Sequence, residues 1–185
     1  MIQFDFEDTR TAFSIKSDRD LRRAHILFKL ISYPILVKIG NPVIRVLSTL
    51  RIPVGWIVKP TAFKHFVGGS TLEECQPAVE KLKRANVYSI LDYSVEGKHT
   101  DKAINAALEE TLRAVKHAGS NTDIPFAVFK PTAFGGHHAL EILSGESGPP
   151  PNIREEGEKF RQRIDTLCRT AFENGIPIMI DAEDT

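Results

Sequence analysis

From Thr71 to Ile180 the sequence alternates between segments with helical periodicity and short apolar runs, and this alternation restricts the possible folds more than any other feature. The expected helices span residues 71–86, 100–119 and 152–174. An expected strand follows each helix, at residues 87–92, 124–130 and 176–180. Helices and strands that alternate at this spacing are typical of a right-handed parallel α/β sheet. We therefore predict an α/β fold.

The second apolar run has the clearest strand pattern. Phe126 to Phe129 is uninterrupted by polar residues, follows Pro125 and stops before Pro131. Such a run suits a strand that is covered on both faces. Lys130 comes directly after it, at the carboxyl end where α/β folds bind their ligands. Lys130 is therefore a site candidate, and the alternative is a lysine whose side chain only reaches solvent.

The N-terminal third of the chain has the pattern of short apolar helices. A first helix is expected to start at Ser17 and to end or kink at Pro34, and a break at residues 40–42 is expected to separate a second short helix from a third. We expect two parts, a lead-in and helical arm at residues 1–67 and an α/β part at residues 68–185.

The arm combines apolar residues with a one-sided charge. No Asp or Glu occurs from Leu21 to Leu72. The basic residues of this stretch are Arg22, Arg23, Lys29, Lys38, Arg45, Arg51, Lys59 and Lys64. Apolar faces and basic side chains together favour peripheral docking of residues 21–64 on an anionic membrane. Packing of the arm on its own catalytic domain or on a neighbouring subunit would use the same residues.

Charge balance and termini limit the partners and the location. The chain has 24 basic and 24 acidic residues, so nucleic acid is not an expected partner. The acidic start, with Asp5, Glu7 and Asp8, resembles neither a signal peptide nor a transit peptide. Lys38 and Arg45 interrupt the longest uncharged stretches, so no helix is expected to span a bilayer. We expect a cytoplasmic protein, with peripheral attachment to the inner membrane as the alternative.

The sequence predicts no metal site. Cys75 and Cys168 are too few for a disulfide framework or a cysteine-based zinc site. His137 and Glu141 have the spacing of helical metal ligands, but two groups do not make a zinc site.

All three expected strands carry charge at their carboxyl ends. Asp92 and Glu96 follow the first strand, Lys130 the second, and Asp181 and Glu183 the third. If the strands are neighbours, these side chains converge on one rim of the sheet. A lysine beside carboxylates can bind an anionic group of a substrate or act as an amine nucleophile. Solvated or ion-paired loop charges are the alternative.

Four segments together resemble the N-terminal half of proline dehydrogenases, most closely the bacterial and eukaryotic single-function type. They are Phe-Val-Gly-Gly at 66–69, Val-Tyr-Ser-Ile-Leu-Asp-Tyr-Ser-Val-Glu-Gly-Lys at 87–98, Phe-Lys-Pro-Thr-Ala-Phe at 129–134 and Ile-Asp-Ala-Glu-Asp-Thr at 180–185. The resemblance implies a partial TIM-like (β/α)₈ barrel, of which this chain holds the first three strands, preceded by a helical arm. It also implies a flavoprotein with FAD over the strand ends. The implied reaction is the oxidation of L-proline to 1-pyrroline-5-carboxylate in proline catabolism, with electrons passed to a membrane quinone.

The same resemblance implies roles for individual residues. Lys130 is similar to the lysine that contacts the substrate carboxylate, and Asp181 to the active-site aspartate. Ala182 is similar to the neighbour whose backbone lies against the flavin. Asp92 and Glu96 resemble an acidic pair that helps to organise the substrate-binding arginines. A cation suits a carboxylate, and the flavin carries the hydride chemistry.

The later strands of that family, and its paired arginines in a Tyr-x-x-Arg-Arg motif, do not occur in this sequence. We therefore expect a truncated oxidoreductase that is inactive alone and does not retain FAD. Two other interpretations remain open from the residues alone. One is an aldolase-like barrel enzyme in which Lys130 forms a Schiff base, and the other is a non-catalytic fragment that docks on membranes or other partners.

Overall fold

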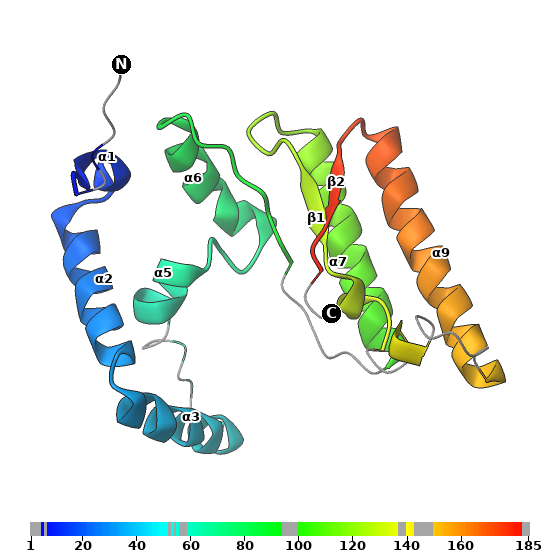
Figure 1. Ribbon diagram of the computed structural model, residues 1–185, viewed down its shortest axis with the longest axis horizontal. Helices are drawn as coiled ribbons and strands as arrows, with labels where there is room; N and C mark the ends of the chain where they lie inside the picture. The colour runs from blue at the N-terminus through cyan, green and yellow to red at the C-terminus, as the bar shows by residue number, and fades with distance from the viewer. Residues whose placement is uncertain are drawn as a thin grey trace. The chain divides into compact units, whose positions relative to one another are not determined.

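The computed structural model describes residues 5, 7–51, 53, 55, 59–93, 100–136, 140–142 and 150–182 (Figure 1). The chain divides into two compact units, Met1–Lys81 (unit 1) and Leu82–Thr185 (unit 2). These units are defined by compactness, so the expected division after residue 67 into an arm and part of a barrel stays a prediction.

Unit 1 is helical. Its elements are α1 (Arg10–Phe13), α2 (Asp18–Ile31), α3 (Pro34–Thr49), the π-helical turn η1 (Lys59–Phe63), α5 (Lys64–Phe66) and most of α6 (Leu72–Lys83). The start of α2 is a capping box, in which the Ser17 hydroxyl accepts a hydrogen bond from the Asp20 backbone N–H and the Asp20 carboxylate accepts one from the Ser17 backbone N–H. This confirms the expected helix start.

One expected break in the arm is wrong. The sequence predicts a break at Gly40 to Pro42, whereas α3 runs without interruption from Pro34 to Thr49 with Pro42 inside it. A proline removes one backbone donor from a helix, but starting a new helix requires a further unfavourable nucleus. Continuing the existing helix through Pro42 therefore remains the favoured outcome.

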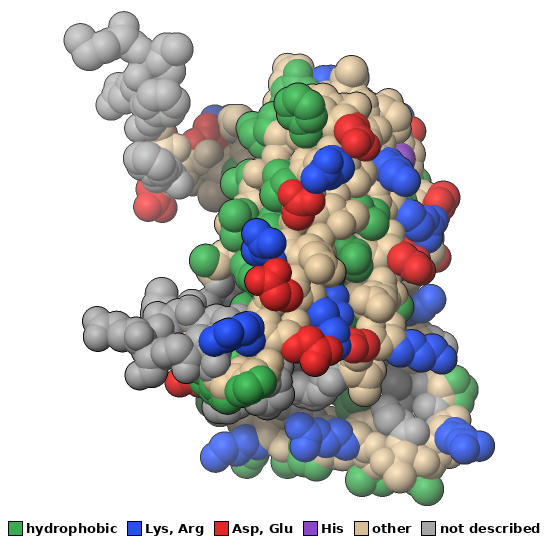
Figure 2. All heavy atoms as spheres, turned by 90° about the vertical axis from the view of Figure 1, so that its right-hand side faces the viewer, with side chains coloured by type: hydrophobic (Ala, Val, Ile, Leu, Met, Phe, Trp, Pro, Cys, Tyr) green, Lys and Arg blue, Asp and Glu red, His purple; other side chains and the backbone are tan. Residues whose placement is uncertain are grey.

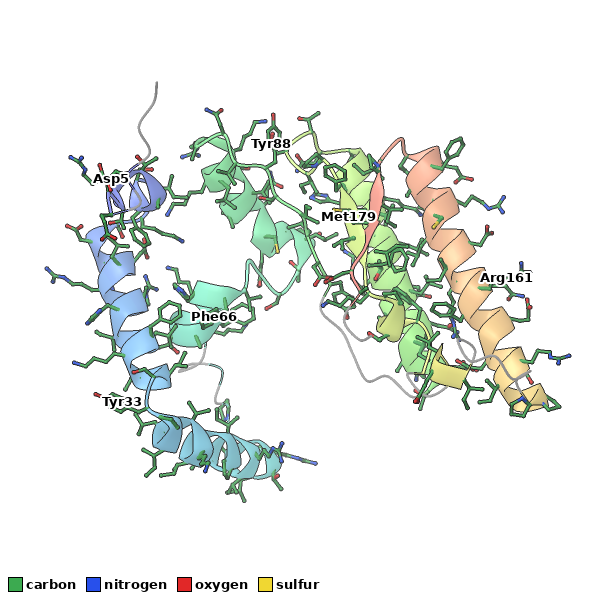
Figure 3. The ribbon with its side chains drawn as sticks, viewed as in Figure 1. Asp5, Tyr33, Phe66, Tyr88, Arg161 and Met179 are labelled. Atoms are coloured by element: carbon green, nitrogen blue, oxygen red, sulfur yellow. The ribbon has the colours of Figure 1, made fainter. Side chains whose placement is uncertain are left out.

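An aromatic cluster joins α2 to α5 in unit 1. The Phe28 ring lies 5.2 Å from the His65 ring and 6.0 Å from the Phe66 ring, in edge-to-face geometry (Figure 3). Most other large apolar side chains of α2 and α3 are exposed. Among the described residues no single helix is long and apolar enough to cross a membrane, and α2 with Pro34–Leu47 meets that test only as a pair bent by 87°.

Unit 2 contains the sheet. Its elements are α7 (Asp101–Gly119), β1 (Ala127–Phe129), the 3₁₀ turn η2 (Pro131–Ala133), α9 (Pro151–Glu173) and β2 (Ile178–Ile180). β1 and β2 are parallel, with Ala127 opposite Ile178 and Phe129 opposite Ile180. The helices α7 and α9 lie side by side next to this pair (Figure 1). The described residues are thus mostly helical with one short parallel strand pair, and β1, α9 and β2 form a βαβ unit, which confirms the α/β expectation in part.

The core of unit 2 lies between the two helices and β1. Val115 of α7, Leu167 of α9 and Phe134 after η2 are almost completely buried. Burying a side chain of this size contributes about 1.5–3 kcal/mol. Thr111 is also buried, and its hydroxyl donates to the Ala107 carbonyl at 2.9 Å. The solvent face of α9 carries interspersed basic and acidic side chains (Figure 2).

The strands are shorter and fewer than expected. The expected strands at 124–130 and 176–180 each contain a three-residue strand, and residues 87–92 form none, so that expectation is wrong. The Ser89 backbone N–H donates to the Asp123 carbonyl at 3.1 Å, but a strand requires a ladder of such bonds. Within the described residues the sheet is therefore a single parallel pair.

Candidate active site

Lys130 sits at the point where β1 leaves the sheet. Its backbone is extended, with φ −102° and ψ 122°, and it caps the 3₁₀ turn that starts at Pro131. Pro131 has no backbone N–H, so the ladder cannot continue through it. Successive strand side chains point to opposite faces, and Phe129 is buried in the core. Lys130 therefore faces away from the core side of β1.

Two carboxylates surround the Lys130 ammonium. Its Nζ atom lies 3.2 Å from Oδ2 of Asp181 and 3.9 Å from Oδ2 of Asp92. The Lys130 side chain is only 11% exposed, compared with 48% for Asp181 and 32% for Asp92. The predicted convergence of these three residues is confirmed. With 11% exposure, the Lys130 side chain does not simply extend into solvent. A cation with so little exposure requires paired anions, and Asp181 and Asp92 provide them.

The strand register sets the position of Asp181. Its backbone N–H donates to the Phe129 carbonyl at 3.0 Å, which extends the ladder one step beyond β2. Asp181 is therefore held beside Lys130 at the carboxyl ends of the parallel pair. A register slip of one residue would turn these side chains to the opposite face.

Asp92 reaches the site on an irregular segment that is anchored at Asp123. The Asp123 carbonyl accepts the Ser89 N–H, and its carboxylate lies 3.0 Å from Lys83 Nζ. The Lys83 ammonium also lies 3.8 Å from the centre of the Tyr88 ring (Figure 3). Tyr88, followed by Asp123, raises the pKa of Lys83. These contacts fix the segment that carries Asp92 beside the chain that enters β1.

The charges of the cluster favour one use of the lysine over another. Two carboxylates lie within 4 Å of the Lys130 Nζ atom, and carboxylate oxygens can accept hydrogen bonds from an ammonium group. An ammonium has no lone pair with which to attack a carbonyl carbon, but it can donate hydrogen bonds to an anionic group. Forming a Schiff base would instead require the neutral amine of Lys130.

The remaining sequence candidates are placed as follows. Ala182 follows Asp181 and is exposed. Glu96, Glu183 and His137 lie outside the described residues. Within the part of the chain that the structure describes, no group of three or more His, Cys, Asp or Glu side chains could hold a metal ion.

The sequence analysis did not identify a buried arginine that contacts the loop after Lys130. Arg163 of α9 is 8% exposed at its side chain and donates to the Phe134 carbonyl at 2.9 Å and to Asp101 Oδ1 at 2.8 Å. Arg163, Leu167 and Ala171 are all buried at a spacing of four residues. A basic residue in phase with the apolar stripe of a helix is the signal that could have identified it.

A polar groove of about 360 Å³ lies between α7 and α9, apart from Lys130. Asp101, Asn105, Lys159 and Arg163 are among the residues that line it. Its charges pair with one another, since Asp101 also lies 3.2 Å from Lys159 Nζ. The Arg163 hydrogen bond, followed by that of Lys159, lowers the pKa of Asp101. The groove thus contains a structural ion-pair network.

Comparison with known proteins gives consistent matches. A family model described as proline dehydrogenase matches residues 75–185. The carbapenem antibiotics biosynthesis protein CarD of Pectobacterium carotovorum subsp. carotovorum is 30% identical over 120 residues, which cover 65% of this chain and 32% of that protein. The mitochondrial proline dehydrogenase 1 of Caenorhabditis elegans is 38% identical over 122 residues, or 60% of this chain and 19% of that protein.

A third relative matches over more of the chain. The hydroxyproline dehydrogenase of Xenopus laevis is 23% identical over 206 aligned residues, covering 94% of this chain and 44% of that protein. The chain thus spans about a third of the first of these three relatives and less than half of each of the others.

Proposed function

Because this chain belongs to the proline dehydrogenase family, we propose that it forms part of an enzyme that oxidises L-proline to 1-pyrroline-5-carboxylate. The observation that carries the proposal is the Lys130 ammonium at the end of β1, 3.2 Å from Asp181 and 11% exposed. This places a cation of fixed position at the rim where α/β proteins bind ligands.

In this proposal Lys130 binds the carboxylate of proline. Asp181 and Asp92 hold the ammonium from two sides, so the substrate meets a donor that is already oriented. The incoming carboxylate takes up hydrogen bonds of the ammonium in place of part of its contact with Asp181, which is the more exposed of the two carboxylates. Asp181 is the proposed catalytic residue because it lies beside Lys130, where the substrate carboxylate would bind.

FAD is the proposed cofactor, and Ala182 is the proposed contact. Ala182 directly follows Asp181 and is exposed, and its methyl side chain leaves the backbone accessible to a flat ring. When bound, FAD would supply the acceptor for the hydride from the ring carbon that is bonded to the proline nitrogen and does not carry the carboxylate. Lys130 and Asp181 would orient the substrate for this loss, and the proton of the nitrogen would leave to water. Asp92 and Glu96 are proposed to organise further cationic groups of the substrate site.

We propose that β1, α9 and β2 belong to a (β/α)₈ barrel. A parallel pair joined by a helix is the repeating unit of that fold. Met179 and Ile180 of β2 are 46% and 64% exposed, although strands of a barrel are covered on both faces. Further strands and helices of a barrel would cover these side chains.

The basic arm is proposed to bring the enzyme to an anionic membrane, where a quinone accepts the electrons. Ile26, Ile35 and Leu50 are each more than half exposed, and the stretch 21–72 has basic but no acidic residues. Apolar and basic side chains reinforce each other at the interface with anionic lipids. The proposed location is the cytoplasmic side of the inner membrane.

A binding comparison tests the carboxylate role of Lys130. L-Proline and pyrrolidine share the ring and the amine, but pyrrolidine lacks the carboxylate. We expect the purified chain to bind proline more tightly than pyrrolidine, and Lys130→Met to abolish that difference. Lys102→Met is the matched control, because Lys102 is an exposed lysine on α7. Equal binding of both ligands by the unaltered chain would contradict the proposal.

The Schiff-base alternative has its own test. Borohydride trapping with a carbonyl substrate would leave a covalent adduct on Lys130 in an aldolase-like enzyme. We expect no adduct, because an ammonium between carboxylates is not a nucleophile.

A further inference from the structure

Arg163 connects three elements around the loop that follows Lys130. Its Nη1 atom donates to the Phe134 carbonyl at 2.9 Å, and its Nη2 atom donates to Asp101 Oδ1 at 2.8 Å. Its Nη1 atom also lies 3.5 Å from Glu156 Oε1. The guanidinium of α9 thus reaches the loop after β1 and the first turn of α7 together.

The buried location of Arg163 makes these contacts specific. Its side chain is 8% exposed, and an unsatisfied buried charge would be strongly destabilising. A carboxylate alone could neutralise the charge of Arg163. One branch of the guanidinium nevertheless donates a hydrogen bond to the main-chain carbonyl of Phe134. A planar fork with two fixed donor directions determines where that carbonyl lies.

The loop from Lys130 to Gly135 is short and held at both ends. At its start, Lys130 continues from β1 and its carbonyl accepts the Ala133 N–H at 3.1 Å. At its end, a Cβ atom on Gly135 would lie 2.9 Å from the Phe160 ring, so the backbone packs closely against α9. The Phe134 ring packs back on Phe129 at 5.9 Å.

We propose that Arg163 is a positioning residue for Lys130. By fixing the Phe134 carbonyl against α9, it adds to the strand register in holding the Lys130–Gly135 loop in the conformation in which the ammonium lies close to Asp92 and Asp181. The significance of this position for catalysis rests on the proposed function of Lys130 as the carboxylate-binding residue. The positioning itself is independent of that role, because it concerns only the surroundings of the Lys130 amine.

Residue-resolved amine labelling of the full chain tests the proposal without proline or flavin. The rate at which a small acylating reagent modifies each lysine is followed by peptide mass spectrometry. In Arg163→Gln we expect the Lys130 rate to rise by roughly threefold or more, since residues that are coupled through a backbone shift interact with energies worth factors of about 2 to 100. The rate at Lys83, which is ion-paired with Asp123 in the same unit, should stay unchanged.

Arg161→Gln is the matched control. Arg161 lies two residues away on α9, is 80% exposed, and pairs with Glu158 on its own helix (Figure 3). We expect this variant to leave the Lys130 rate unchanged. A folded Arg163→Gln protein with the original Lys130 rate would overturn the proposal, and so would an equal rise at Lys83, which indicates general loosening.

If Arg163→Gln unfolds, as judged by circular dichroism, Arg163→Lys carries the test. A single ammonium cannot reproduce the fork that reaches Phe134 and Asp101 together. We expect the Lys130 rate to rise by roughly twofold in this variant, and an unchanged rate in the folded protein would overturn the proposal. If the Lys130 rate rises in the Arg163 variant but the unaltered chain does not bind proline, only the proposed function is contradicted.

Discussion

The Lys130 ammonium lies 3.2 Å from the Asp181 carboxylate, and each residue directly follows one strand of the parallel pair. The pairing of Phe129 with Ile180, followed by the bond from the Asp181 N–H to the Phe129 carbonyl, determines this contact. The register of the β1–β2 pair therefore determines both the packing of the sheet and the position of the proposed site residues. The same alignment that buries Phe129 in the core presents the cation and the carboxylate on the other side of the sheet.

Replacing Asp181 by Asn should lower the stability of unit 2 by about 1 kcal/mol, because Lys130 is nearly buried while Asp181 is half exposed to screening solvent. The change keeps the shape of the side chain and removes its charge. Urea unfolding followed by circular dichroism measures the effect.

Asp165→Asn is the control for that measurement. Asp165 pairs with Arg169 on the surface of α9, and both side chains are more than 60% exposed. Loss of this ion pair should lower the free energy of unfolding by only about 0.3–0.5 kcal/mol. Equal effects of the two substitutions would show that the Lys130–Asp181 pair is no stronger than a surface pair.

The sequence predicted more of the candidate site than of the fold around it. Carboxyl ends of parallel strands share one edge, so the charges at 130 and 181 could be brought together from their places after apolar runs. Asp92 lies beside them although residues 87–92 form no strand. Two expectations failed for different reasons. A helix already started at Pro34 continues through Pro42, and the apolar run at 87–92 lacks a ladder partner within the described residues.

Arg163 was missed for a different reason. Charged residues in a long helix are usually assigned to its solvent face, and neither Asp101 nor the Phe134 carbonyl is close to Arg163 in the sequence. The buried stripe of Arg163, Leu167 and Ala171 was readable from spacing alone. The partners of the guanidinium became evident only from the packing of α9 against α7 and the loop.

Adding a methyl group at Gly135 should disturb the loop after Lys130. A Cβ atom there would lie 2.9 Å from Phe160 Cδ2 and 3.3 Å from Leu140 Cδ2. Overpacking of this kind costs about 1–3 kcal/mol. Gly135→Ala should therefore lower the midpoint of urea unfolding.

The adjacent glycine provides the control for this prediction. A Cβ atom on Gly136 would meet nothing within 4 Å among the described residues. Gly136→Ala should be neutral or slightly stabilising, since alanine reduces the freedom of the unfolded chain. A destabilised Gly136→Ala together with an unaffected Gly135→Ala would contradict the described packing of the loop on α9.

Acid should weaken the network that contains Asp101. Arg163, then Lys159, holds the pKa of Asp101 below its ordinary value in the folded protein. Its contribution to stability is therefore complete above the unfolded pKa, about 4, and is lost as the pH falls through the lower folded pKa. Thermal unfolding measured between about pH 2 and 7 should show a shallower acid slope for Asp101→Asn.

Part of the acid slope should remain in that variant. The pKa values of Asp20 and Glu74 are also lowered, by hydrogen bonds from Ser17 and Ser70 respectively. Both carboxylates lose their contributions over the same acid range. An identical slope for Asp101→Asn and the unaltered chain would contradict the assignment to Asp101.

The arm should bind anionic vesicles through its charge and its apolar side chains together. Each basic residue close to an anionic surface contributes about 1 kcal/mol, so Lys38→Gln should weaken binding by roughly fivefold. Ile35→Glu should weaken it further, because Ile35 is 65% exposed on α3 and would bring a negative charge to the surface. Flotation with vesicles that contain phosphatidylserine, at low and high salt, measures both effects.

Phe172→Glu is the control, because Phe172 is 86% exposed but lies on α9 of unit 2, outside the arm. If the arm is the docking element, this change should leave flotation unaltered, although it also replaces an exposed apolar side chain by an acid. Binding that resists salt and is weakened equally by Phe172→Glu would indicate adsorption of exposed apolar surface in general. If the chain does not float but sediments as a dimer that Ile35→Glu dissociates, the arm packs on a neighbouring subunit and the membrane proposal fails.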